Sequence, residues 1–280
     1  MLNPGRRGTD RGAALRRRFD LLVLSDIHLG TPACRAAELN AYLKSVAPGR
    51  IVLNGDIVDM WDFRKGYWPE SHLKVVRRLL KFAAGGTPVH YLPGNHDGAL
   101  RRYLPLGLGE LHLDDRLELD LDGVRTLFLH GDAADLLLGT PRWVARLGAL
   151  SYDALEWTSN RLNAVRRWCG RPPRSLAATV KANLAAAQRH VARFEEVCAR
   201  LAAERGCGAV VCGHIHVAAD RRLRIGERSV RYLNSGDWVD SLTALEYDAG
   251  SWRVARWHEL AAAGAVRAPE LDETAAVGAA

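Results

Sequence analysis

The chain has 280 residues, of which 48% are hydrophobic, and its formal net charge at pH 7 is +7. This length allows one large domain or two small ones, and the hydrophobic content predicts a full core. The positive charge favours an anionic partner, which can be a nucleic acid, an acidic membrane surface or a phosphorylated substrate. None of the five cysteines forms a C-x-x-C pair, so neither a disulfide framework nor a zinc knuckle is expected.

The two ends of the chain lack recognisable motifs. Residues 1–18 are rich in Gly and Arg and are expected to form a disordered basic tail, without the apolar core of a signal peptide. Residues 261–280 are rich in Ala and are expected to be a second disordered tail. The chain has no uninterrupted run of about eighteen apolar residues, so we expect no transmembrane helix and a cytoplasmic location.

Five segments share one design, in which an apolar run is followed by a small residue and then by Asp, Asn or His. They are residues 19–26, 50–56, 88–97, 125–132 and 208–216. Helices are predicted between some of them, around 35–47 and 70–84, and strands that alternate with helices indicate a layered α/β fold. After residue 216 the pattern favours consecutive antiparallel strands with tight turns, so two packed sheets between helices are expected.

Residues 135–205 are expected to form a helical insertion relative to a minimal core. This segment has twelve Lys or Arg against six Asp or Glu, and it contains Trp143, Trp157 and Trp168. Basic residues interleaved with Trp and Leu favour an interfacial helix, while ordinary helical packing with a solvated basic face is the alternative. Within it, Arg167, Arg174 and Lys181 are candidates for pairing with substrate phosphates.

Side chains that suit divalent metal ions follow each of the five predicted strands. They are Asp26 and His28, Asp56 and Asp59, Asn95 with His96 and Asp97, His130, and finally His214 and His216. Residues i and i+2 of an extended segment point the same way, which predicts that each D-x-H or H-x-H pair enters one site. The mixture of donors suits Mn, Fe, Zn, Co or Mg. Six or seven ligands fit two ions that share a carboxylate, and Asp56 is the candidate bridge.

The ordered motifs D-x-H, G-D-x-x-D, G-N-H-D, H and G-H-x-H, between Asp26 and His216, resemble those of the calcineurin-like metallophosphoesterase superfamily. The resemblance implies a four-layer α/β/β/α sandwich over residues 19–260 and a dinuclear centre in which a metal-activated hydroxide attacks phosphorus. It also implies the ligand sets: Asp26, His28, Asp56 and His216 hold one ion, and Asp56, Asn95, His130 and His214 hold the other.

Three further residues of these motifs have expected roles near the two ions. His96 is assigned to transition-state stabilisation or leaving-group protonation, with Asp97 fixing its tautomer. Asp59 is expected to orient a ligand histidine. A structural turn or helix cap is the alternative for both Asp59 and Asp97.

Within that superfamily, residues 25–30, 54–63 and 232–247 most resemble the UDP-2,3-diacylglucosamine pyrophosphatase group of lipid A biosynthesis. The resemblance implies two Mn ions, cleavage of the pyrophosphate of that or a similar lipid-linked substrate, and a peripheral position on the cytoplasmic face of the inner membrane. The chain departs from well-known members at His96, where they have Arg. A general phosphoesterase acting on nucleotides, cyclic nucleotides or phosphoproteins is therefore the alternative. A non-catalytic scaffold is opposed by the complete ligand set, and no nucleic-acid-binding motif is apparent.

Overall fold

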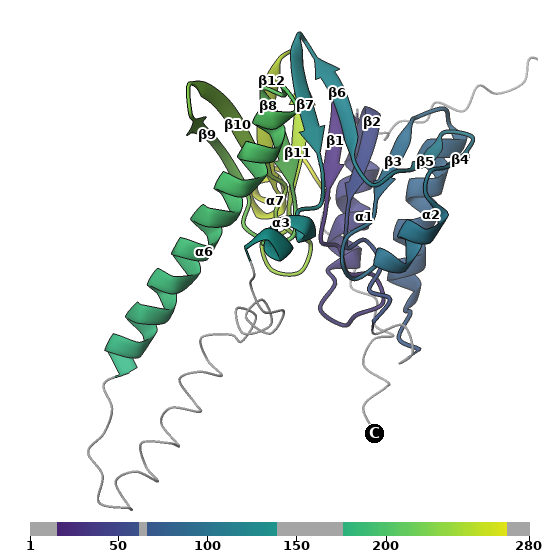
Figure 1. Ribbon diagram of the computed structural model, residues 1–280. Helices are drawn as coiled ribbons and strands as arrows, with labels where there is room; N and C mark the ends of the chain where they lie inside the picture. Colours follow the sequence, from purple (N-terminus) through teal and green to yellow (C-terminus); the bar gives the residue numbers. More distant parts are fainter. Residues whose placement is uncertain (1–15, 62–65, 139–175, 268–280) are drawn as a thin grey trace, which may run out of the picture.

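Two β-sheets pack face to face in the computed structural model, which describes residues 16–61, 66–138 and 176–267 (Figure 1). The first sheet has the order β12 (Ser251–Arg256), β11 (Thr243–Asp248), β1 (Arg17–Leu24), β2 (Val46–Asn54), β3 (Val89–Leu92), β5 (Leu111–Leu113) and β4 (Leu106–Leu108). The second has the order β6 (Leu117–Leu121), β7 (Val124–Phe128), β8 (Ala209–Cys212), β10 (Arg228–Asn234) and β9 (Ala219–Ile225).

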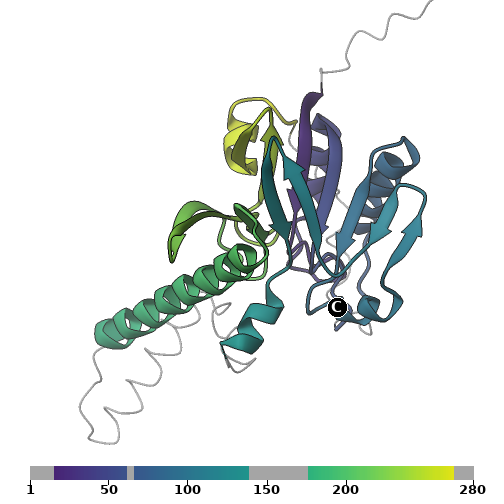
Figure 2. The same cartoon turned by 45° about the horizontal axis from the view of Figure 1, so that its top comes forward.

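Helices cover the outer face of each sheet, which confirms the expected α/β/β/α layers (Figure 2). The first sheet is covered by α1 (Ala36–Ser45) and α2 (Glu70–Ala84), close to the helices predicted at 35–47 and 70–84. The second is covered by α6 (Leu176–Glu204), with α3 (Asp132–Leu137) beside it. A 3-10 helix, η2 (Gly98–Tyr103), follows β3, and α7 (Trp257–Ala262) follows β12. Among the helices of the described ranges, none combines the length and hydrophobicity that crossing a bilayer requires.

The continuous apolar run of β1 is explained by burial on both faces. Leu22 and Leu24 point into the core beneath α1 and α2, while Leu21 and Val23 point into the layer between the two sheets. Alternate side chains of this one strand therefore contribute to two hydrophobic cores. The layer between the sheets is completed from the second sheet by residues that include Phe128, Val211 and Leu233.

Parallel pairing fixes where the strands end. β1, β2 and β3 run parallel in the first sheet, and β7, β8 and β10 run parallel in the second. The side-chain amide of Asn54, at the end of β2, donates to the carbonyls of Leu129 (3.0 Å) and Val211 (3.2 Å) and so ties the two sheets together. The carboxyl ends of both parallel sets consequently meet at one edge of the sandwich.

Part of the segment expected to be an insertion belongs to the core of the sandwich. In the C-terminal half of α6, Phe194, Cys198 and Ala202 are fully buried against the second sheet, so this half of the helix is an outer layer of the fold. Residues 139–175, with Arg167 and Arg174, lie outside the described residues, as does the side chain of Lys181. At the ends of the chain, β1 already begins at Arg17 and Val266 is buried, inside the two segments expected to be tails.

Replacing Phe194 by Ala tests how strongly α6 is part of the core. The ring is fully buried, so we expect F194A to lower the free energy of unfolding by about 3–5 kcal/mol through lost burial and the cavity left behind. The exposed neighbouring change R193A should alter it by less than about 0.5 kcal/mol. Urea denaturation measures both values, and equal effects would show that α6 does not pack as described.

Candidate metal centre

The loops that follow β1, β2, β3, β7 and β8 meet at the edge where the parallel strands end. Backbone hydrogen bonds hold them together: the amide of Asp26 donates to the carbonyl of Gly55 (3.0 Å), and that of Gly213 donates to the carbonyl of His130 (3.0 Å). The amide of Met60 likewise donates to the carbonyl of His96 (3.2 Å). The convergence that the strand ends predict is therefore observed, and it is backbone pairing between loops that produces it.

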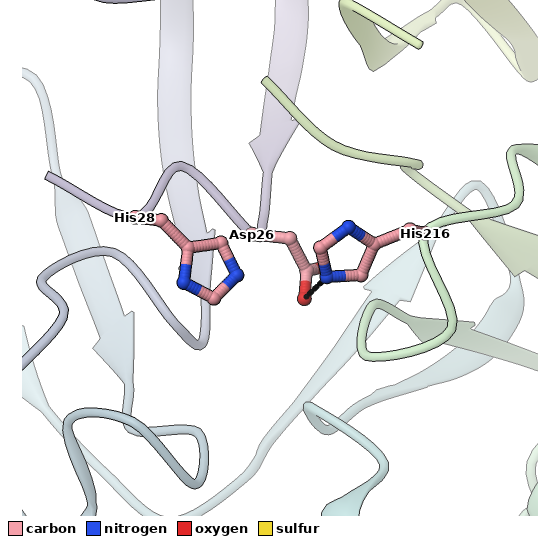
Figure 3. A group of neighbouring side chains, drawn as sticks. All are labelled: Asp26, His28 and His216. Atoms are coloured by element: carbon pink, nitrogen blue, oxygen red, sulfur yellow. Dashed lines mark ion pairs between the residues drawn. The ribbon is translucent and has the colours of Figure 1, made fainter. Parts of the chain in front are cut away.

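Donor side chains gather there in three overlapping groups, and within each group the donor atoms lie within 4.8 Å of one another. The groups are Asp26, His28 and His216 (Figure 3); His28, Asp56 and His96; and Asp56, His130 and His214. The side-chain oxygen Oδ1 of Asn95 lies 3.3 Å from Nε2 of His130 and adds an amide donor to the third group. The structure thus brings all seven expected ligands into one site, with Asp56 shared by two of the groups.

These donor side chains are oriented by a left-handed backbone conformation and not by an extended strand. Five candidate ligands have positive φ angles: Asp26 (50°), His28 (54°), Asp56 (53°), His214 (72°) and His216 (55°). The prediction that paired residues align because they lie in extended segments was wrong, since β1 ends at Leu24 and β8 ends at Cys212. Asp26 and His28 still meet, but His214 and His216 enter different groups. Such sparsely populated conformations are costly and persist only where the surrounding structure holds them.

Two glycines leave room for the buried carboxylates. A Cβ atom on Gly213 would lie 2.5 Å from Oδ2 of Asp26, and one on Gly94 would overlap Oδ1 of Asp56. Neither position has the positive φ that favours glycine, so close approach to a carboxylate is the reason for glycine at both.

The imidazoles are oriented as metal-binding histidines usually are. Nδ1 of His130 donates to the carbonyl of Asn54 (2.9 Å), which leaves Nε2 facing Asp56 at 3.4 Å. Nδ1 of His28 lies 3.3 Å from Oδ2 of Asp59, while its buried Nε2 has no hydrogen-bond partner among the described residues. A buried imidazole nitrogen without a hydrogen-bond partner, in a group of carboxylates and histidines, can donate its lone pair to a cation, so these residues suit a divalent ion.

Asp59 lies beside a candidate ligand histidine as expected, 3.3 Å from Nδ1 of His28, whereas Asp97 has different surroundings from those expected. Oδ2 of Asp59 also lies 2.7 Å from Nδ1 of His96, so Asp59 and not Asp97 is the carboxylate beside that ring. The fully buried Asp97 instead accepts hydrogen bonds from the hydroxyl of Tyr91 (2.6 Å) and the amides of Gly94 (2.5 Å) and Ile57 (2.9 Å). The catalytic assignment of Asp97 is therefore corrected to the structural alternative, a carboxylate that ties two loops together.

Buried charge dominates the electrostatics of the site. Burial alone raises the pKa of both Asp26 and Asp56, but His216 beside Asp26 and His130 beside Asp56 outweigh it and hold both pKa values below the ordinary one. Burial lowers the pKa of both histidines, and the carboxylates more than reverse this, to about 10 for His130 and about 9 for His216. Without metal, protons therefore neutralise this site, and a bound cation has to displace them.

Asp135 is a residue of this site that the sequence analysis missed. Its Oδ2 accepts a 2.6 Å hydrogen bond from Nε2 of His214, and its Oδ1 lies 3.5 Å from Nε2 of His190 on α6. The signal was the spacing H-G-D-A-A-D, which places Asp135 one helical turn after Asp132 on a helix that begins directly beyond His130. An insertion that is expected to begin at residue 135 separates Asp135 from this motif, although the structure keeps the two together.

Comparisons with known proteins identify a family and several relatives. The family model for calcineurin-like phosphoesterases matches residues 19–218. A UDP-2,3-diacylglucosamine hydrolase from Stenotrophomonas maltophilia is 26% identical over 82% of this chain and 96% of its own, and one from Xanthomonas campestris pv. campestris is 27% identical over 81% and 95%. Among solved structures, a dimetal phosphatase from Danio rerio is similar at 14% identity, with a TM-score of 0.40 over 85% of this chain and 95% of that one.

The pairing of His130 with Asp56 predicts a pH dependence for the metal-free chain. The pKa of His130 is raised from 6.5 to about 10, so its stabilising effect is complete below pH 6.5 and is lost as the pH rises toward 10. The pKa of Asp56 is lowered from 3.8, so its effect is present above pH 3.8 and is lost as the pH falls below it.

We therefore expect the difference in unfolding free energy between the parent chain and H130Q to be largest between pH 3.8 and 6.5. Urea denaturation in the presence of a chelator measures it, and H258Q, at an exposed histidine, is the control. A difference that grows from pH 6.5 to pH 9 would contradict the assigned pairing.

Proposed function

Because the chain belongs to the calcineurin-like phosphoesterase family and is a metal-dependent phosphoester hydrolase, we propose that its three overlapping donor groups form a dinuclear metal centre. The observation that carries the proposal is the position of Asp56, whose carboxylate is common to two groups and is almost completely buried. A carboxylate shared in this way can bridge two cations, and a buried one requires positive charge beside it.

Each ion has its own set of donors in this proposal. Asp26, His28, Asp56 and His216 hold one, and Asp56, Asn95, His130 and His214 hold the other. The first set is supported by Nε2 of His28, which is buried without a hydrogen-bond partner in the part of the chain that the structure describes. The second is supported by the ring of His130, which the carbonyl of Asn54 orients through Nδ1. Carboxylate, amide and imidazole together suit Mn, which we propose as the metal, with Fe, Zn, Co or Mg as alternatives.

The chain's own residues position the substrate and move a proton. When bound, two divalent ions lower the pKa of water and offset charge on the phosphoryl oxygens. His96 lies against the middle donor group, with Nε2 4.0 Å from Asp56 and Nδ1 2.7 Å from Asp59. With Nδ1 turned toward the Asp59 carboxylate, Nε2 of His96 faces the donor group and is placed to stabilise the transition state or to protonate the leaving oxygen. The ring of Trp61, 3.8 Å from that of His96 and half exposed, keeps one face of the imidazole away from water.

The substrate that we propose is UDP-2,3-diacylglucosamine or a similar lipid-linked pyrophosphate. The support is twofold: relatives matched over more than 90% of their length are UDP-2,3-diacylglucosamine hydrolases, and residues 54–63 and 232–247 resemble that group. Such a substrate places the enzyme at the cytoplasmic face of a membrane. One observation favours the alternative of a general phosphoesterase: His96 occupies the position at which well-known members of the group have Arg.

A substrate comparison with Mn separates the two functions. We expect kcat/KM for UDP-2,3-diacylglucosamine to exceed that for a generic aryl phosphodiester, with UMP identified as product by mass spectrometry. D56N, which keeps the shape of the side chain but removes its charge, should abolish turnover of both substrates. Equal or lower activity on the lipid substrate would favour the general phosphoesterase, and a D56N variant with parental turnover would refute the metal centre itself.

Asp135 is proposed to position His214 for the second ion. Since Nε2 of His214 donates to Asp135, only Nδ1 of that ring has a lone pair for a metal. D135N weakens the acceptor and should lower the affinity for Mn, measured by calorimetry, roughly 10–100-fold. D132N is the matched control, because Asp132 on the same helix faces Arg101 at 2.8 Å. The control should lose stability without a comparable loss of affinity, and equal affinity losses would contradict the proposed role.

A further inference from the structure

Helices α1 and α2 lie side by side on the outer side of the first sheet (Figure 1), and basic side chains from them and from the residue just before β1 form one face. Its cations, which define the α1–α2 face, are Arg16, Lys44, Lys74, Arg77, Arg78 and Lys81. Two hollows of about 280 and 270 Å³ lie in this face, and Arg78 and Lys81 line both of them. The face is therefore a continuous basic surface that the candidate metal centre does not use.

The positive charge of the α1–α2 face is largely uncompensated. Nζ of Lys74 lies 3.3 Å from the carboxylate of Glu70, but among the described residues no carboxylate pairs with Lys44, Arg77 or Lys81. Burial and the nearby Arg16 lower the pKa of Arg78, as expected where cations crowd together. Crowded cations without acidic partners create a potential that attracts an anionic surface.

Exposed apolar side chains share this face with the cations. Leu73 and Leu80 are 37% and 52% exposed, and their spacing of seven residues puts both on the side of α2 that carries Arg77. Val75 and Leu79, on the opposite side of the helix, are buried beneath it. The outward side of α2 thus combines leucines with cations instead of being purely polar.

This combination selects among anionic partners. A nucleic acid or a soluble polyanion would pair with the cations but would leave both leucines in water. A bilayer with anionic head groups pairs with the cations at its surface and buries the leucines at the boundary of its acyl chains. We propose that the α1–α2 face is a docking surface for an anionic lipid bilayer.

Docking along α2 would bring the bilayer beside the metal centre. The amide of Gly30, two residues after His28, donates to Nδ1 of His72 (2.9 Å) in the first turn of α2, so this end of the helix adjoins the site. Tyr67, which precedes the helix, is 43% exposed there, and an amphipathic ring suits the head-group region. The inference concerns docking alone and does not depend on which phosphoester is hydrolysed.

Vesicle binding by the full chain tests whether the cations of the α1–α2 face bind anionic lipid. We expect it to co-sediment with vesicles of phosphatidylcholine and phosphatidylglycerol, less so at high salt, and not with phosphatidylcholine alone. The triple variant R77Q/R78Q/K81Q should lower the partition coefficient roughly a hundredfold. A charge-matched control, R222Q/R224Q/R228Q, changes arginines on β9 and β10 at the other side of the molecule and should have a far smaller effect (Figure 1). Equal losses in the two variants, or equal binding to both kinds of vesicle, would overturn the proposal.

A second variant distinguishes a bilayer from a polyanion. L73S/L80S should lower vesicle partitioning roughly tenfold, because it removes the apolar contribution while keeping the charge. Vesicle binding that is indifferent to this change, together with tight binding of a duplex oligonucleotide, would overturn the bilayer in favour of nucleic acid. All variants should hydrolyse a water-soluble aryl phosphodiester as the parent does, which separates a failure of docking from a failure of the proposed function.

Discussion

The burial of two carboxylates, Asp26 and Asp56, is the constraint on which the arrangement of this fold depends. Removing such charges from water is very costly unless positive charge is placed beside them. The arrangement of the sandwich meets that requirement, because two parallel strand sets end at one edge and bring histidines from both sheets to the carboxylates. Protons on His130 and His216 supply the positive charge in the metal-free chain, and in the proposed metal centre divalent ions would supply it.

The same requirement explains why small residues and a polar network surround the site. Gly94 and Gly213 let backbone approach the carboxylates, and the amide of Asn54 joins the two sheets directly behind them. Asp97 ties the loops after β2 and β3 together by accepting from three backbone amides and a buried tyrosine. Stability and metal binding are thus linked, because the bonds that hold the loops also place the donors.

Much of the fold and the site can be predicted from the sequence, since both depend on local patterns. Apolar runs ending in Asp, Asn or His identify β1, β2, β3, β7 and β8, and the helix predicted around 70–84 is α2. The partners of Asp97 and Asp135 cannot be obtained in this way, because these contacts join different segments of the chain, although local spacing marks Asp135 as a candidate. The sequence also predicts only one concentration of basic residues, at 135–205. The basic α1–α2 face cannot be recognised from the sequence, because it forms only when two helices lie side by side.

The left-handed conformation of five candidate ligands restricts how this site can be re-engineered. Asp, Asn and His tolerate positive φ better than most residues, whereas β-branched side chains tolerate it poorly. Exchanges among those three residue types would alter the coordination chemistry on a nearly unchanged backbone. An alanine scan would confound two quantities, the loss of a donor atom and the relaxation of a strained turn, so libraries intended to change metal preference are best confined to the permissive trio.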